Sequence, residues 1–176
     1  MNRSSGPRWC APALLALLLS ACDLGGPFNP DAGLPAFDVI VGGVELRANS
    51  SAAVASGNVF TILLSDQPNA CQQYGHFPAM TWTTLSMKVA ADQNTPTVGT
   101  VAPQQGLPGP GQVVGALVKA TADLPPVASL GLQEGTVTWK SNSDFSVTIQ
   151  SMDVGFAGTA DRLRAGPFTV PPCTPQ

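Results

Sequence analysis

The sequence predicts an all-β protein, built as an antiparallel β-sandwich or barrel-like domain of about nine or ten strands. Three observations lead to this fold class. Most apolar runs are short, rich in Val, Ile, Thr, Phe or Trp, and bounded by Gly, Pro, Asn or Asp, as in strands separated by turns. No segment of the domain has the apolar spacing of an amphipathic helix. The connections are also too short for helical crossovers, which favours antiparallel pairing.

Four strands are expected in the first part of the domain, in residues 37–41, 44–47, 52–55 and 59–64. Gly42-Gly43 joins the first two, either as a hairpin turn or as a bend within one strand. Residues 56–58 form the next turn. Residues 59–64 are apolar on both faces, so we expect this strand to lie in a central position with both faces covered.

Residues 65–79 form the longest irregular connection of the first half, and one helical turn is expected around residues 70–73. The next strand, in residues 81–89, alternates between apolar and polar side chains. The side chains expected to point inward are those of Leu85, Met87 and Val89.

Six further strands are predicted, in residues 98–102, 112–120, 134–140, 144–150, 159–164 and 166–170. Two Pro-rich and Gly-rich connections are expected, in residues 103–111 and 122–131. Residues 141–143 are polar and join two alternating strands, which predicts a hairpin. Residues 152–156 extend the second of these strands, and Gly155 and Gly158 allow a bulge there. The last two strands are expected to pair with each other.

The N-terminal residues have the organisation of an export signal. Two arginines precede an uncharged apolar run in residues 13–19, and Ser20-Ala21-Cys22 follows it. The apolar run is too short for a stable bilayer-spanning helix and suits a signal peptide. Residues 19–22 resemble the lipobox of bacterial lipoproteins. The alternative is an ordinary secretory signal followed by an incidental cysteine.

The resemblance to bacterial lipoproteins implies that Cys22 carries diacylglycerol, that the chain is cut before it, and that the new amine is acylated. Two or more acyl chains hold a protein stably on a bilayer without a membrane-spanning helix. We therefore expect a signal peptide in residues 1–21, a lipidated Gly-rich and Pro-rich tether in 22–35, and a single β-rich domain in 36–176. The expected location is the cell envelope. The inner and the outer membrane both remain open.

The charge balance disfavours two classes of partner. From Cys22 onward the chain has three Lys and three Arg against eleven acidic residues, a formal net charge of −5. Nucleic-acid binding requires a basic face, which this composition does not supply. Electrostatic docking to anionic lipid headgroups is disfavoured for the same reason.

Cys71 and Cys173 are the two cysteines that remain after lipidation of Cys22. Thiols left over in an exported, oxidised chain most often pair, so we expect a disulfide between them. A metal site or a catalytic thiol is the alternative, but the chain has no Cys-x-x-Cys and only one histidine, His76.

A second resemblance involves the C-terminal half. Residues 154–159 read Val-Gly-Phe-x-Gly-Thr, and residues 166–173 read Gly-Pro-Phe-x-Val-Pro-x-Cys. These endings are similar to those of uncharacterised exported lipoproteins of Gram-negative bacteria. In such proteins the last cysteine pairs with one that follows a Leu-Ser-Asp-like stretch, and here residues 64–66 precede Cys71. The family has no assigned activity.

No set of residues in the sequence predicts catalysis, a cofactor or a metal site. His76 lies in a polar loop, and the chain has no Gly-x-Ser-x-Gly elbow for a Ser-His-Asp site. Glu45 and Glu134 are the only glutamates and lie on separate predicted strands, where acidic side chains are usually solvated. We expect a non-enzymatic protein without a cofactor.

The aromatic residues leave a second hypothesis open. Trp139 and Trp82 are expected mainly in the core, but Trp82, Tyr74 and Phe77 together would make a binding platform if exposed. The leading hypothesis is a lipid-anchored envelope protein acting as a structural or interaction module. The alternative is a module that binds a glycan or peptide through residues 65–79, with Tyr74, His76, Phe77 and Trp82 as candidate contacts.

Overall fold

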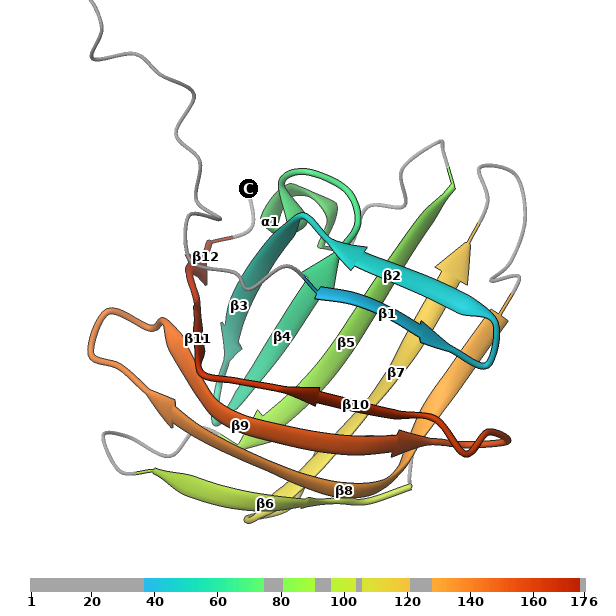
Figure 1. Cartoon of the computed structure of the whole chain (residues 1–176). Coiled ribbons are helices and arrows are strands. Elements are labelled where there is room, and N and C mark those ends of the chain that lie inside the picture. Colours follow the sequence, from blue (N-terminus) through green and yellow to red (C-terminus); the bar gives the residue numbers. More distant parts are fainter. Residues whose placement is uncertain (1–36, 75–80, 91–95, 104–105, 121–127, 175–176) are drawn as a thin grey trace, which may run out of the picture.

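The computed structural model describes residues 37–74, 81–90, 96–103, 106–120 and 128–174, which form twelve strands and one short helix (Figure 1). The strands are β1 (Phe37–Val41), β2 (Val44–Ala48), β3 (Ser50–Ser56), β4 (Val59–Ser65), β5 (Trp82–Ala90), β6 (Thr97–Val101), β7 (Gln112–Ala120), β8 (Ala128–Ser141), β9 (Val147–Phe156), β10 (Arg162–Ala165), β11 (Phe168–Val170) and β12 (Pro172–Cys173). The helix is α1 (Ala70–Gln73), at the place where a single helical turn is predicted. The predicted all-β class is confirmed.

Ten of the strands form one large curled sheet, in the order β10-β9-β8-β6-β7-β5-β4-β3-β12, with β11 also pairing with β9. The long strand β8 pairs with β7 through its first residues and with β6 through its later ones. The sheet is mixed, because β6 runs parallel to β7 and β12 runs parallel to β3. The expectation of a purely antiparallel sheet is therefore wrong at these two pairs.

The predicted hairpin of residues 37–47 is present as a separate two-stranded sheet, β1–β2. Its turn is Gly42-Gly43, with φ angles of 54° and 79° that glycine adopts without steric cost. Figure 1 shows the hairpin lying across the large sheet, where β2 contacts β4 and β5. The side chains of Val41, Val44 and Leu46 point into the core and are buried there. The hairpin thus covers one face of the sheet.

The main core collects side chains from almost every strand. Leu85, Met87 and Val89 are fully buried, as their alternation predicts. Trp139 is also fully buried, and its indole Nε1 donates a hydrogen bond to the carbonyl oxygen of Ala90 at 3.2 Å. Nine strands of the large sheet and the hairpin therefore meet around a core that the sequence pattern identifies only in part.

A second, smaller apolar cluster lies on the other side of β3 and β4, under α1. Its buried members are Ala52, Val54, Leu63, Ala70 and Cys173. Because β4 contributes to both clusters, both of its faces are covered, and the predicted central position of residues 59–64 is confirmed.

Three features of the strands differ from the prediction. Residues 128–131, expected in a connection, belong to β8 and pair with β7. The next strand begins at Val147 rather than residue 144, because the Asp144 carboxylate accepts hydrogen bonds from the backbone N–H and the hydroxyl of Ser146 and closes a turn there. Strands β10 and β11 do not pair with each other. Both pair with β9, one after the other along its length.

The C-terminal residues connect the two ends of the curled sheet. Strand β11 pairs with β9, Pro171 follows, and β12 pairs with β3. The backbone N–H of Ala53 in β3 donates to the carbonyl oxygen of Pro171 at 2.8 Å. Figure 1 shows this red segment rising from β9 toward β3. Residues 168–173 therefore hydrogen-bond to strands that are far apart in both the sequence and the sheet order.

Candidate functional site

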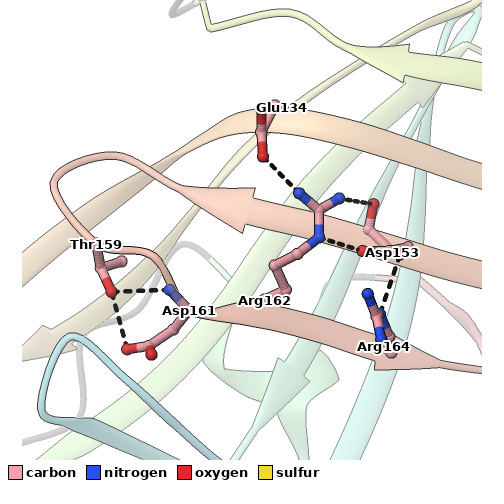
Figure 2. A network of polar contacts seen from close by, with 6 residues as sticks. All are labelled: Glu134, Asp153, Thr159, Asp161, Arg162 and Arg164. Atoms are coloured by element: carbon pink, nitrogen blue, oxygen red, sulfur yellow. Dashed lines mark hydrogen bonds and ion pairs between the residues drawn. The ribbon is translucent and has the colours of Figure 1, made fainter.

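Charged side chains from three neighbouring strands meet on the outer face of β8, β9 and β10 (Figure 2). In the strand register, Glu134 of β8 and Arg162 of β10 both lie opposite Gly155 of β9. Figure 2 shows their side chains meeting across β9, and Nη1 of Arg162 donates a hydrogen bond to Oε1 of Glu134. A Cβ atom at Gly155 would lie 3.1 Å from Cγ of Glu134. The ion pair therefore depends on the missing side chain at position 155.

Asp153 fixes the second part of this network. Nε of Arg162 donates to its Oδ1 at 2.6 Å, and Nε of Arg164 donates to its Oδ2 at 3.1 Å. The hydrogen bond from Arg162 holds the pKa of the Asp153 carboxyl below its ordinary value, and the same contact raises the pKa of Arg162. Both groups are therefore charged at neutral pH, and each oxygen of Asp153 has a guanidinium partner.

A β-bulge places Glu134 on the solvent face. Leu132 pairs with Phe156 and Glu134 pairs with Gly155, so Gln133 is an extra residue in β8. As a result, Leu132 is buried while both Gln133 and Glu134 are exposed. The sequence predicted a bulge in the strand that contains Gly155, which is β9. The structure has the bulge in β8, opposite this glycine.

Asp161 links the loop after β9 to the tip of the β1–β2 hairpin. Its Oδ2 accepts hydrogen bonds from the backbone N–H of Gly42 and from the hydroxyl of Thr159, both at 2.8 Å. The backbone N–H of Asp161 donates to the Thr159 hydroxyl oxygen at 3.0 Å. The Gly42 N–H, followed by the Thr159 hydroxyl, lowers the pKa of the Asp161 carboxyl.

A cleft of about 290 Å³ lies at one end of β8, β9 and β10. It is lined by Gln133, Glu134, Gly155, Phe156, Gly158, Thr159, Ala160, Asp161 and Arg162. Its polar groups include carboxylates, a guanidinium, a primary amide and a hydroxyl, so it offers hydrogen-bond donors and acceptors together. Within the described ranges, no three His, Cys, Asp or Glu side chains lie close enough to hold a metal ion.

The disulfide predicted from the cysteine count is present in the structure. The sulfur atoms of Cys71 and Cys173 lie 2.01 Å apart, and the Cα atoms are separated by 5.4 Å. The bond joins α1 to β12 and therefore fixes the end of the chain to the outer face of β3 and β4. Cys22 lies outside the described residues.

The predicted aromatic platform is only partly described. Tyr74 is half-buried and packs against the second, smaller apolar cluster under α1. Trp82 is half-buried at the start of β5, where it pairs with Ala120 of β7. His76 and Phe77 lie outside the described residues. Of the four candidate contacts, the structure therefore describes only Tyr74 and Trp82, and neither is fully exposed.

Sequence reasoning did not identify the Arg162 network. Glu134 was expected to be solvated, and its side chain is indeed 68% exposed, but it also pairs with Arg162. The two residues are 28 positions apart, and their contact requires the pairing of both neighbouring strands with β9. The local sequence gives one indication of this region, the spacing Thr159-x-Asp161, which is typical of a turn closed by a side-chain-to-backbone hydrogen bond.

Among the residues that the structure describes, no helix is long and apolar enough to cross a membrane. No family model, no curated protein and no solved structure matches this chain. The inferences about function therefore rest on the sequence and on the structure itself.

Proposed function

We propose that this protein is a lipid-anchored component of the bacterial cell envelope, whose β-rich domain acts as a non-enzymatic structural or interaction module. The lipobox-like residues 19–22, placed directly after an apolar run of signal-peptide length, carry the proposal. Acyl chains on Cys22 provide stable attachment to a bilayer. The Gly-rich and Pro-rich residues 23–35 form the tether to the domain.

The chemistry of the cleft and of the neighbouring Asp153–Arg164 contact supports a non-enzymatic role. A general acid at neutral pH needs a carboxyl whose pKa is raised toward the working pH. Hydrogen bonds lower the pKa of the carboxyls of Asp153 and Asp161, so both remain ionised. Arg162 and Arg164 already occupy the oxygens of Asp153. These contacts hold side chains in place and do not prepare one for proton transfer.

The architecture supports a module that presents a surface. We propose that the curled sheet is a sandwich, with β3, β4, β5 and β7 in one layer and β8, β9, β10 and the hairpin in the other. Buried side chains from both sets of strands belong to one core. Residues 168–173 connect β9 of one layer to β3 of the other, and the disulfide fixes β12 to α1 on the layer of β3 and β4.

The anchor is tested by replacing Cys22 in the full-length protein expressed in a bacterium. Cys10 precedes the apolar run and would be removed with the signal peptide, so Cys10→Ser is the control. Native protein and this control should lose residues 1–21, incorporate radiolabelled palmitate and sediment with membranes. The Cys22→Ser variant should incorporate no label and remain uncleaved or become soluble. A Cys22→Ser variant that is cleaved like native protein and still sediments with membranes would show that this cysteine is not the anchor.

A further inference from the structure

We propose that Phe145, at the tip of the turn between β8 and β9, inserts into the bilayer that holds the acyl chains of Cys22 and thereby orients the domain on the membrane. The inference rests on the proposed lipid anchor, because a single apolar group does not hold a protein stably on a bilayer. It adds a second point of membrane contact, which belongs to the folded domain.

The turn directs the side chain of Phe145 away from the fold. The backbone of this residue is left-handed, with a φ angle of 63°, and its side chain is 61% exposed. The N–H of Phe145 donates to the carbonyl oxygen of Asn142 at 3.0 Å, and the N–H of Asn142 donates to that of Ser146 at 2.9 Å. These two hydrogen bonds close the turn and hold Phe145 in its conformation.

The polar side chains next to Phe145 are engaged within the turn. Oδ1 of Asp144 accepts hydrogen bonds from the backbone N–H and the hydroxyl of Ser146, at 3.0 and 2.7 Å. Nδ2 of Asn142 donates to the hydroxyl oxygens of Ser146 and Thr148, at 2.9 and 3.1 Å. The tip therefore presents an apolar ring above a fixed polar base. Such an arrangement suits the membrane interface, where apolar groups enter the acyl region and polar groups stay with the headgroups.

The fold itself does not require phenylalanine at this position. Left-handed backbone favours glycine, asparagine or aspartate, and a bulky side chain there is unusual. An exposed ring also gains little from packing against its own chain. A residue held in an unfavourable conformation without a structural benefit is typical of a functional contact. That contact is apolar, because a phenyl ring has no hydrogen-bonding group.

The small size of the tip favours a bilayer over a protein as the partner. A stable protein interface buries about 800 Å² on each side, which one turn with a single apolar side chain does not offer. A bilayer needs no complementary surface and accepts one ring among its acyl chains. From Cys22 onward the net charge is −5, which disfavours electrostatic attraction to anionic headgroups. Apolar insertion is then the means by which the domain gains a contact with the membrane.

The place of the anchor in the chain allows the turn to reach the bilayer. Residues 22–35 are 14 residues that span at most about 50 Å, and the ten residues of β9 measure about 33 Å. Strand β1 leads to Gly42, whose N–H contacts Asp161 in the loop at the far end of β9. Phe37 is therefore the end of β1 nearer to the β8–β9 turn (Figure 1). The chain enters the domain from the side on which Phe145 lies.

Insertion of one ring is strong enough to orient an anchored protein but not to recruit a free one. Complete burial of a phenylalanine side chain shifts an equilibrium roughly 10- to 100-fold. In an anchored chain the bilayer is present at a high effective concentration, so the inserted orientation predominates.

Fluorine NMR on the mature protein in phosphatidylcholine nanodiscs tests the inference. The protein is isolated from the bacterial envelope after incorporation of 4-fluorophenylalanine, and its fluorine signals are measured with and without a spin-labelled lipid. The signal of residue 145 is the one that Phe145→Asn lacks. Ile40→Phe is the matched control, because Ile40 is 63% exposed and lies two residues before Gly42, at the opposite end of β9.

We expect the spin-labelled lipid to accelerate relaxation of the residue-145 signal at least about fivefold more than that of the residue-40 signal in Ile40→Phe, because the inserted orientation is favoured roughly 10- to 100-fold. Equal acceleration of the two signals, or none at residue 145, would overturn the inference and leave Phe145 as a contact for a protein partner.

The state of the anchor is read separately, by mass spectrometry of the same sample. If Cys22 carries no acyl chain, its thiol is coupled to a maleimide-bearing lipid in Cys10→Ser protein, and the relaxation measurement is repeated. Cys71 and Cys173 do not react, because they are joined in the disulfide. Failure of the proposed anchor and failure of insertion therefore give different results.

Discussion

Phe145, in the turn between β8 and β9, combines two unfavourable features. Its φ angle of 63° lies in the left-handed region, which costs a residue with a Cβ atom about 1–2 kcal/mol. Its side chain is 61% exposed, so packing against the rest of the chain offsets little of this unfavourable energy. The turn imposes the angle, because the N–H of Phe145 donates to the carbonyl oxygen of Asn142, and the N–H of Asn142 donates to that of Ser146.

We predict that Phe145→Asn raises the free energy of unfolding by about 1 kcal/mol, since asparagine tolerates left-handed backbone much better. Urea unfolding followed by tryptophan fluorescence measures the change. Val98→Asn is the control, because Val98 is 64% exposed but lies in the extended strand β6. If both variants gain equally, loss of exposed apolar surface rather than relief of backbone strain explains the result.

Among the structural elements, the β1–β2 hairpin has a distinct attachment. It is a separate sheet that covers the core through Val41, Val44 and Leu46. Its tip is also held by one polar contact, from the N–H of Gly42 to the carboxylate of Asp161. The pKa of this carboxyl in the folded protein lies below the ordinary value of 3.8. Its contribution to stability is therefore complete above about pH 4 and is lost as pH falls through the lowered pKa.

We predict that acidification below about pH 4 weakens the hydrogen-exchange protection of the Gly42 amide in native protein, because protonated Asp161 is a poorer acceptor. In Asp161→Asn this protection should be lower at neutral pH and nearly independent of pH, after correction for intrinsic exchange. Asp144→Asn is the comparison. Its carboxyl also has a lowered pKa, caused by Ser146, but it lies in the β8–β9 turn. Equal effects of the two variants on Gly42 would refute the local attachment.

At the scale of the whole molecule, the disulfide and strand β12 both attach the C-terminal residues to the first half of the domain. The Cys71–Cys173 bond spans 102 positions, and β12 has only two residues with which to pair with β3. Such a short strand contributes few backbone hydrogen bonds. The covalent link therefore provides much of its attachment, by restricting the unfolded chain.

We predict that replacing both Cys71 and Cys173 with Ser lowers the free energy of unfolding by about 4–5 kcal/mol, the loop-entropy value for a loop of this length. Urea unfolding provides the measurement. Reduced native protein should unfold at nearly the same midpoint as the double variant, which separates the missing bond from the substituted side chains. A double variant as stable as the oxidised protein would contradict the structural role of the bond.

Local patterns were sufficient to predict much of the fold. The alternation that buries Leu85, Met87 and Val89 is visible in the sequence, and so is the Gly42-Gly43 turn. The pairing of β12 with β3 was not predictable in this way, because it depends on the path of the whole chain. The cleft was missed for the same physical reason. Glu134 and Arg162 meet only because two strand registers align them with Gly155.

The connection of β9 to β3 by residues 168–173 also sets an order of events during synthesis. These residues follow every other described strand in the chain, so they leave the ribosome after all of them. Until they arrive, the outer edge of β3 has no neighbour, and the core lacks the side chains of Phe168 and Val170. Oxidation of Cys71 must also wait for Cys173. The domain therefore matures in a single late step, and a chain cut before residue 168 keeps an open strand edge that quality-control proteases and other unfolded chains can bind.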